Sequence, residues 1–261
     1  MRRAVVLLVV AFILRSFARA ETYTGGTLTL SWNNPPPPYC AHGDTISASA
    51  TANYDPNLPE GTEWYWIDSA YTFSWSFSPD GTCTVSSNDN ETSATGSFSD
   101  PDDPGGLKTV EVTADLTGQI GIDDGEGTTL EVVAGPVSLD AIVNVLVVKI
   151  DSVSALCWTR GDGYKHCKVM PDGSAQPPNG TLSVWIMWSA DAREHLSLNP
   201  PATAHSPVAY DPGWNVTFGP YTSDGTPTVG FNGNIKAELV VGNAKVQKFK
   251  WFTVQRAPVE P

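Results

Sequence analysis

The chain has 261 residues, with 28 Asp and Glu against 15 Lys and Arg, so its formal net charge is −13 at pH 7. Nucleic acids bind clustered Lys and Arg, and this charge balance therefore excludes them as an expected partner. The 23 glycines, 21 prolines and frequent Thr, Ser and Val, without long apolar stretches at helical spacing, predict an all-β protein. The length suits two domains of ordinary size or one large β domain.

The first twenty residues have the features of an export signal. A basic start at Met1–Arg3 precedes an apolar run over residues 4–14, and Ala18–Ala20 has the small-x-small form of a cleavage site. The apolar run is too short to span a bilayer, and no later stretch approaches the required length. We therefore expect residues 1–20 to be removed as a signal peptide. The mature protein would then be secreted or extracytoplasmic, on the cell surface or in a bacterial periplasm, without a membrane span.

Four cysteines in an exported chain predict two disulfide bonds. Cys40 and Cys83 lie in the first half of the chain, while Cys157 and Cys167 flank one short segment. We therefore expect the two local pairs, Cys40 with Cys83 and Cys157 with Cys167, although spacing alone leaves other pairings open. Four buried free thiols are the alternative. The chain has no CxxC motif, so the sequence does not support a zinc ribbon or a thioredoxin-like redox site.

The first half of the chain reads as a series of strands. Residues 27–32 predict a strand that ends at Pro35–Pro38, which cannot donate to a sheet and should form a stiff extended connector. Residues 44–53 predict a second strand. Residues 71–77 alternate aromatic and small polar side chains, the period of a strand that covers a hydrophobic core; stacking on sugar rings is the alternative if this face is exposed. The aromatic members are Tyr71, Phe73, Trp75 and Phe77.

The segment from Asp44 to Asp115 combines this aromatic strand, which ends in YTFSWSFSPDG, with a PGG turn and a TVEVTA strand. It resembles the polycystic-kidney-disease-type (PKD) and related immunoglobulin-like modules of secreted and cell-surface proteins. The family element W-x-F-G-D-G is altered here, because Trp75 to Gly81 read WSFSPDG, without the glycine before the aspartate and with one residue of difference in register. The resemblance implies an immunoglobulin-like sandwich, and such modules mostly serve as spacers or adhesive units.

The second half predicts another sandwich. Residues 141–150 form a long apolar strand that should close the first domain, so we place the domains at 21–150 and 151–261. A short turn of helix is expected within residues 190–197. The expected fold is all-β, with two tandem immunoglobulin-like β-sandwich domains. Strands of the second domain are predicted near residues 152–158, 180–188, 215–218, 234–241 and 248–254. The basic segment at residues 245–250 is interpreted as a strand with a solvated face.

Arg160, Gly161 and Asp162 lie between the two cysteines that we expect to pair. An Arg and an Asp separated by a flexible Gly at a loop tip is the arrangement that integrin ligands use. A disulfide around the loop would lower the cost of ordering it on binding. The same residues also suit an ordinary hairpin tip. Cell adhesion through this loop is therefore an alternative function for the chain.

The sequence offers few residues for catalysis. It has no GxSxG, HExxH or GxxxxGK[ST] motif, so we expect no enzyme. Glu194 and His195 beside Asp191 could serve a hydrolase, but they are more simply exposed side chains of a polar turn. Carboxylates that only folding brings together leave no sequence spacing, and an unrecognised secreted hydrolase is thus a further alternative. The acidic tip over residues 119–127 could bind calcium, but it does not match a calcium-loop pattern.

We therefore expect a non-catalytic secreted protein that binds an unknown protein or glycan, or that acts as a spacer. No cofactor and no metal are expected. A glycan ligand would need exposed tryptophans as stacking surfaces. The candidates are Trp64, Trp66, Trp185, Trp188, Trp214 and Trp251.

Overall fold

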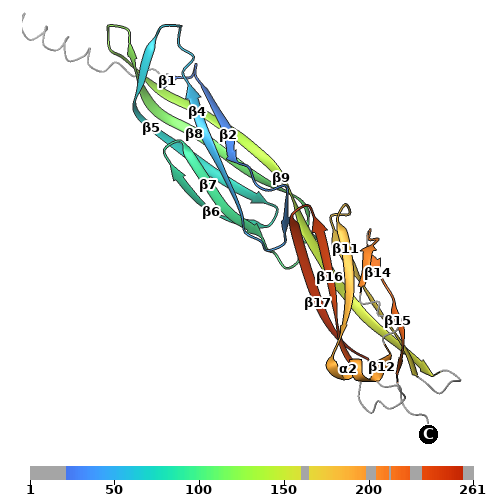
Figure 1. Cartoon of the computed structure of the whole chain (residues 1–261). Helices are drawn as coiled ribbons and strands as arrows, with labels where there is room; N and C mark the ends of the chain where they lie inside the picture. The colour runs from blue at the N-terminus through green and yellow to red at the C-terminus, as the bar shows by residue number, and fades with distance from the viewer. Residues whose placement is uncertain (1–21, 160–164, 198–203, 212, 224–230, 255–261) are drawn as a thin grey trace, which may run out of the picture.

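The computed structural model describes residues 22–159, 165–197, 204–211, 213–223 and 231–254. Regular structure in these residues is almost entirely β, which confirms the predicted fold class. Two sandwiches lie end to end in an elongated molecule, and strand β9 (Thr128–Thr159) runs from the first into the second (Figure 1). Within the described residues, no helix is both long and apolar enough to cross a membrane.

The first sandwich has an immunoglobulin-like strand order. Its strands are lettered A to G in chain order from Thr27, and β3 (Tyr39–Ala41) is the second part of A. The two sheets then have the orders A-B-E-D and C-F-G, with β3 beside G. One sheet has the order β2 (Thr27–Asn34), β4 (Ile46–Asp55), β7 (Glu91–Phe98), β6 (Gly81–Asn88). The other has the order β5 (Glu63–Ser78), β8 (Gly106–Asp123), β9, with β1 (Thr22–Tyr23) and β3 parallel to β9.

The four prolines connect the two sheets of this sandwich. Strand β2 belongs to one sheet and β3 to the other, and Pro35–Pro38 carry the chain between them outside any strand. Pro36 is buried on the way. A segment that cannot donate to a ladder is well suited to leave one sheet and enter another, as the sequence predicted.

The aromatic stripe of β5 faces the core of the first sandwich. Trp75 and Phe77 are buried, and Phe73 and Tyr71 pack against the neighbouring core side chains. The indole Nε1 of Trp75 donates to Thr92 Oγ1 over 2.9 Å, so this buried donor is satisfied. The core interpretation of the stripe is therefore confirmed, and its stacking alternative is wrong.

The second sandwich is again an immunoglobulin-like arrangement. The later part of β9, β10 (Lys165–Gln176) and β15 (Phe218–Ser223) are its strands A, B and E. They pack on strands C′, C, F and G, which are β13 (Ala204–Val208), β11 (Thr181–Trp188), β16 (Phe231–Val241) and β17 (Ala244–Val254). The helix α2 (Ala190–His195), capped by the Ser189 side chain, confirms the predicted short helix. One sheet has the order β12 (Leu196–Ser197), β15, β10, β9, with β14 (Trp214–Asn215) beside β10. The other has the order β13, β11, β16, β17.

Strand β9 belongs to both sandwiches. Its pairing with β8 reaches Val145, opposite Gly106, and its pairing with β10 begins at Val147, opposite Gln176. The ladder therefore changes partner at Leu146, which is fully buried in the core of the second sandwich. This point lies before Ile150–Asp151, and a domain division at those residues stays a prediction.

The short strand β3 also links the two sandwiches. It pairs with β9 in the first sandwich, yet Ala41 is part of the second core and Tyr39 packs against that core. The Asn179 amide donates to the Tyr39 hydroxyl over 3.4 Å, and β17 contacts β3. The junction is thus a packed interface with a continuous strand through it.

The cysteines differ from the predicted pairing in one case. Cys40 and Cys83 are free thiols on strands at opposite edges of the first sandwich, since β3 borders β9 whereas β6 is the edge strand that contacts β5. The structure therefore has no Cys40–Cys83 bond. Cys157 and Cys167 are direct cross-strand neighbours in the β9–β10 ladder, so their side chains lie on the same face. The second predicted bond agrees with this register and stays a prediction.

Candidate binding surface

Large side chains cover the outer face of the β11–β16–β17 sheet. Successive side chains of a strand point to opposite faces, so the residues between the core positions of these strands point outward. The register aligns them in two rows across the sheet. The first row is Trp185, Lys236 and Phe249, and the second is Met187, Asn234 and Trp251. We call these six residues the aromatic face.

The aromatic face is unusually exposed for its chemistry. Trp251 is 75% exposed, Phe249 53% and Met187 39%. On the same strand Val246, Phe252 and Val254 are buried in the core. Large apolar side chains grouped on a surface mark interaction sites more often than isolated ones do. The structure thus presents a sheet face that leaves more than half of the Trp251 and Phe249 side chains in solvent.

A buried polar atom lies within this face. Asn234 is 7% exposed, and its register neighbours are Met187 and Trp251. Its Oδ1 atom is buried and has no hydrogen-bond partner among the described residues. An unsatisfied buried acceptor costs about 1 to 3 kcal/mol. Five other buried side-chain atoms in the described part of the chain also lack a partner, and Asn234 Oδ1 is the one that lies within the aromatic face. A ligand that donates a hydrogen bond here would remove that cost.

The charges beside the aromatic face compensate one another. Glu238 Oε2 lies 3.0 Å from Lys236 Nζ and 3.0 Å from Lys245 Nζ, and it also accepts from Gln247 Nε2. Burial alone would raise the pKa of Glu238, but the hydrogen bonds from Lys245, Lys236 and Gln247 outweigh burial and lower it. Lys236 Nζ also sits 4.6 Å from the ring centroid of Trp185, a cation–π contact. The cluster therefore holds Lys236 in place beside the aromatic rings.

The six tryptophans proposed as stacking surfaces have three different environments. Trp188 and Trp214 are buried in the second core. Trp64 and Trp66 are half-buried against the first core. Only Trp185 and Trp251 among these six lie on an outward face, and of the two Trp251 is the exposed one.

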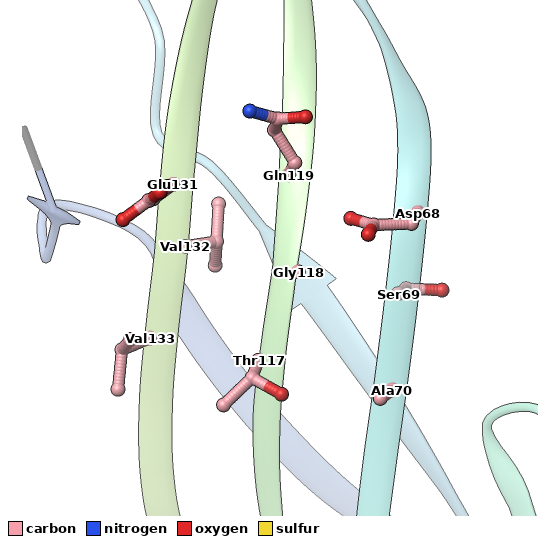
Figure 2. A pocket seen from close by; sticks show the side chains of 9 residues that line it. All are labelled: Asp68, Ser69, Ala70, Thr117, Gly118, Gln119, Glu131, Val132 and Val133. Atoms are coloured by element: carbon pink, nitrogen blue, oxygen red, sulfur yellow. The ribbon is translucent and has the colours of Figure 1, made fainter. Parts of the chain in front are cut away.

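The outer face of the first sandwich carries a shallow depression (Figure 2). Asp68 on β5, Gln119 on β8 and Glu131 on β9 form one row across it, and its volume is about 420 Å³. The two carboxylates are exposed and stand on strands two spacings apart, about 10 Å. A retaining glycosidase needs a carboxyl separation of about 5 Å and an inverting one about 6.5 to 9.5 Å, so this spacing is too wide for the first and close to the upper limit of the second. The depression is shallow and does not form the enclosed cleft that a hydrolase would use.

Acidic side chains in two loops accept hydrogen bonds from backbone amides of their own loops. Asp124 accepts from the Glu126 amide over 2.9 Å and from the Thr128 hydroxyl, and these contacts lower its pKa, with the Thr128 hydrogen bond first. Asp100 accepts from the Asp102 amide over 2.9 Å. Among the described residues, no group of three or more His, Cys, Asp or Glu could hold a metal ion. These contacts favour the solvated-loop interpretation of the acidic tip.

The predicted adhesion residues and the polar residues of α2 are only partly within the described structure. Arg160, Gly161 and Asp162 lie outside the described residues, between the paired strand ends Thr159 and Lys165. Asp191 and Glu194 are exposed on α2, whereas the side chain of His195 is outside the described part. The hydrolase hypothesis gains no support from α2.

Comparison with known proteins adds little to this description. No family model and no curated protein matches the chain. Among solved structures it is similar to the titin Ig tandem domains, with 11% identity over 88% of this chain and 98% of that chain at a TM-score of 0.23. It is also similar to the titin domains z1z2 in complex with telethonin, with 10% identity over 87% and 96% at a TM-score of 0.21. The fold assignment accordingly rests on the strand order described above.

Proposed function

We propose that the chain is an extracytoplasmic, non-catalytic binding module that contacts its ligand through the aromatic face. The observation that carries this proposal is Trp251, which is 75% exposed in a regular strand and shares its outward face with Phe249 and Met187. Burying such side chains on a partner is favourable at about 25 cal/mol per Å² of apolar surface. Tryptophan is also among the residues that dominate binding energies at interfaces.

The first sandwich suits the role of a spacer. It is joined to the second by the continuous strand β9 and by the contacts of β3, so it would hold the aromatic face at a fixed distance from the far end of the first sandwich. This role agrees with the PKD-type resemblance of Asp44–Asp115, whose family members often act as spacers. The PKD-type assignment itself remains part of this proposal.

Export is the second part of the proposal. The basic, apolar and small-residue pattern of residues 1–20 supports it. The test is the mass of the mature protein recovered from its native host. A chain that begins at Glu21 in the extracytoplasmic fraction is the expected result, and an intact leader on a cytoplasmic product would contradict it.

The binding role is tested with an exposed-aromatic variant and a matched control. An array of polysaccharides and extracellular-matrix proteins would be probed with three proteins. They are wild type, a double variant with Trp251→Ala and Phe249→Ala, and the control Tyr65→Ala. Tyr65 is 59% exposed on the first sandwich and therefore matches the loss of an exposed aromatic ring. We expect a wild-type signal that Tyr65→Ala keeps and the double variant loses. A signal that survives in the double variant would remove the aromatic face from the function.

Adhesion through Arg160 and Asp162 is the second candidate function. The observation that favours it is the direct opposition of Cys157 and Cys167, which would let a disulfide close the hairpin below these residues. Asp162→Glu keeps the charge but displaces the carboxylate. Cell attachment to the immobilised protein that is unchanged by this substitution would rule the loop out.

A further inference from the structure

We propose that the aromatic face binds a neutral, hydroxyl-rich glycan chain, with a sugar ring stacked on Trp251 and a sugar hydroxyl donating to Asn234 Oδ1. The inference rests on the proposed binding function and specifies the chemistry of the ligand. It is carried by the combination of a planar exposed ring, an unsatisfied buried acceptor and a charge cluster that is already compensated.

The shape of the face suits an extended ligand. Strands β11 and β17 are separated by β16, so the two sides of the face are about 10 Å apart, and its two rows are about 7 Å apart along the strands. The face is therefore broad enough for neighbouring units of one chain. The C–H face of a pyranose ring is flat and apolar, and it can lie on an indole of similar size. Trp251 offers such a surface, whereas the ring of Trp185 is already in a cation–π contact with Lys236 Nζ.

The Asn234 amide selects for hydrogen-bond donors. Its Oδ1 atom is buried beside Met187 and Trp251 and has no partner in the described part of the chain. A purely apolar surface pressed on this face would leave the acceptor unsatisfied and keep its cost. Trp251 is mostly in solvent, so its ring can shift to admit a hydroxyl. A sugar supplies hydroxyl donors next to its apolar ring face, which matches this arrangement of indole and amide.

The charges favour a neutral glycan over an acidic one. Lys236 and Lys245 both bind Glu238, so neither ammonium group is left without a carboxylate. The chain as a whole has a net charge of −13, which repels a polyanion. An acidic polysaccharide would have to compete with Glu238 for the same lysines and overcome this repulsion. A neutral chain meets neither obstacle.

The test uses defined oligosaccharides and the whole mature chain, from Glu21 to Pro261. The probes are neutral hexasaccharides of β-1,4-linked glucose, mannose, xylose and N-acetylglucosamine, with hexagalacturonate as the anionic probe. Titration calorimetry would be performed on wild type, Trp251→Ala, Asn234→Ala and the matched control Tyr65→Ala. We expect wild type and Tyr65→Ala to bind at least one neutral probe, and Trp251→Ala to bind it about tenfold or more weakly.

Asn234→Ala distinguishes a ligand contact from a structural role. Because Oδ1 has no described partner to lose, we expect this variant to keep or raise the melting temperature while it binds the same probe about tenfold more weakly. A lowered melting temperature with unchanged binding would assign Asn234 to structure alone and overturn its part of the proposal.

The remaining outcomes separate this inference from the proposed function. No binding of any neutral probe at millimolar concentration, or binding only of hexagalacturonate, would overturn the neutral-glycan inference. If a matrix protein on the array nevertheless bound in a Trp251-dependent manner, the binding function would stand with a protein ligand. If no array signal depended on the aromatic face, both proposals would fail.

Discussion

At the scale of single residues, the stability of the first sandwich depends most on a buried ion pair between Lys108 and Asp103. Lys108 Nζ lies 2.8 Å from Asp103 Oδ1, and both side chains are almost fully buried. The Gly105 amide also donates to Asp103 Oδ1 over 2.8 Å. Gly105 has φ +77°, and a Cβ there would approach Val147 Cγ2 to 2.7 Å. The loop with this ion pair therefore packs tightly on β9 where that strand enters the second sandwich.

Removing one member of the pair should destabilise the protein strongly. Lys108→Met leaves the Asp103 carboxylate buried without its cation, and we expect a loss of about 3 to 5 kcal/mol in the free energy of unfolding, measured by urea denaturation. The surface variant Lys245→Met is the control and should cost under about 1 kcal/mol, because its side chain is half exposed. Equal losses in the two variants would show that burial of the pair is unimportant.

The same carboxylate predicts how stability depends on pH. Burial alone would raise the pKa of Asp103, but the Lys108 and Gly105 hydrogen bonds and the charges of Lys108 and His42 outweigh it and lower the pKa. A lowered folded pKa means that the unfolded chain binds the proton first as the pH falls. The stabilisation is therefore complete above the ordinary Asp value of about 3.9 and disappears as the pH falls through the lower folded value.

Thermal melts from about pH 6 to pH 2 would measure this dependence. We expect the melting temperature of wild type to fall steeply through the acid range, and that of Asp103→Asn to start lower and fall less. Parallel curves for the two proteins would mean that other carboxylates account for the acid sensitivity.

At the scale of elements, the strands show what a local pattern can predict. The β5 stripe could be assigned to the core because its aromatic residues share one parity and its polar residues the other. The Pro35–Pro38 connector and the short helix α2 also follow from local chemistry. In β17 both parities carry large apolar residues, so the sequence indicated a strand without revealing which face would be buried.

The aromatic face could not be predicted because it depends on pairing between distant strands. Val246 and Phe249 differ in parity, and only the pairing of β17 with β16 places Val246 in the core and Phe249 in solvent. The position of Asn234 between Met187 and Trp251 requires the register of three strands. The failed Cys40–Cys83 pairing has the same origin, because closeness along the chain does not bring β3 and β6 to the same edge of a sandwich.

The β9–β10 hairpin predicts one specific disulfide bond. Cys157 and Cys167 are opposite each other on the core-facing side of this ladder. We expect the oxidised protein, alkylated after denaturation without reductant, to carry label on Cys40 and Cys83 but not on Cys157 and Cys167. Closing this short loop should stabilise the fold by about 2 to 3 kcal/mol, measured as the shift on adding dithiothreitol. Label on all four cysteines would contradict the bond.

At the scale of the whole molecule, the continuity of β9 determines how the two sandwiches move. The strand pairs with β8 up to Val145 and with β10 from Val147. In addition, Tyr39 and Ala41 belong to a strand of the first sandwich but pack with the core of the second. A hinge would need residues without such pairing. The two sandwiches lie in line in Figure 1. We expect them to tumble as one elongated body.

A two-residue insertion tests this coupling directly. Inserting Gly-Ser between Leu146 and Val147 preserves the alternation of faces in each half of β9, because the side-chain period of a strand is two, but it interrupts the strand at the junction. We expect ¹⁵N relaxation to fit one anisotropic diffusion tensor in wild type and separate correlation times for each sandwich in the insertion variant. The same insertion after Gly125, in the turn between β8 and β9, leaves the junction intact and should keep wild-type tumbling. Independent tumbling in wild type itself would mean that the shared strand does not couple the sandwiches, and the first sandwich could then not hold the aromatic face at a fixed distance.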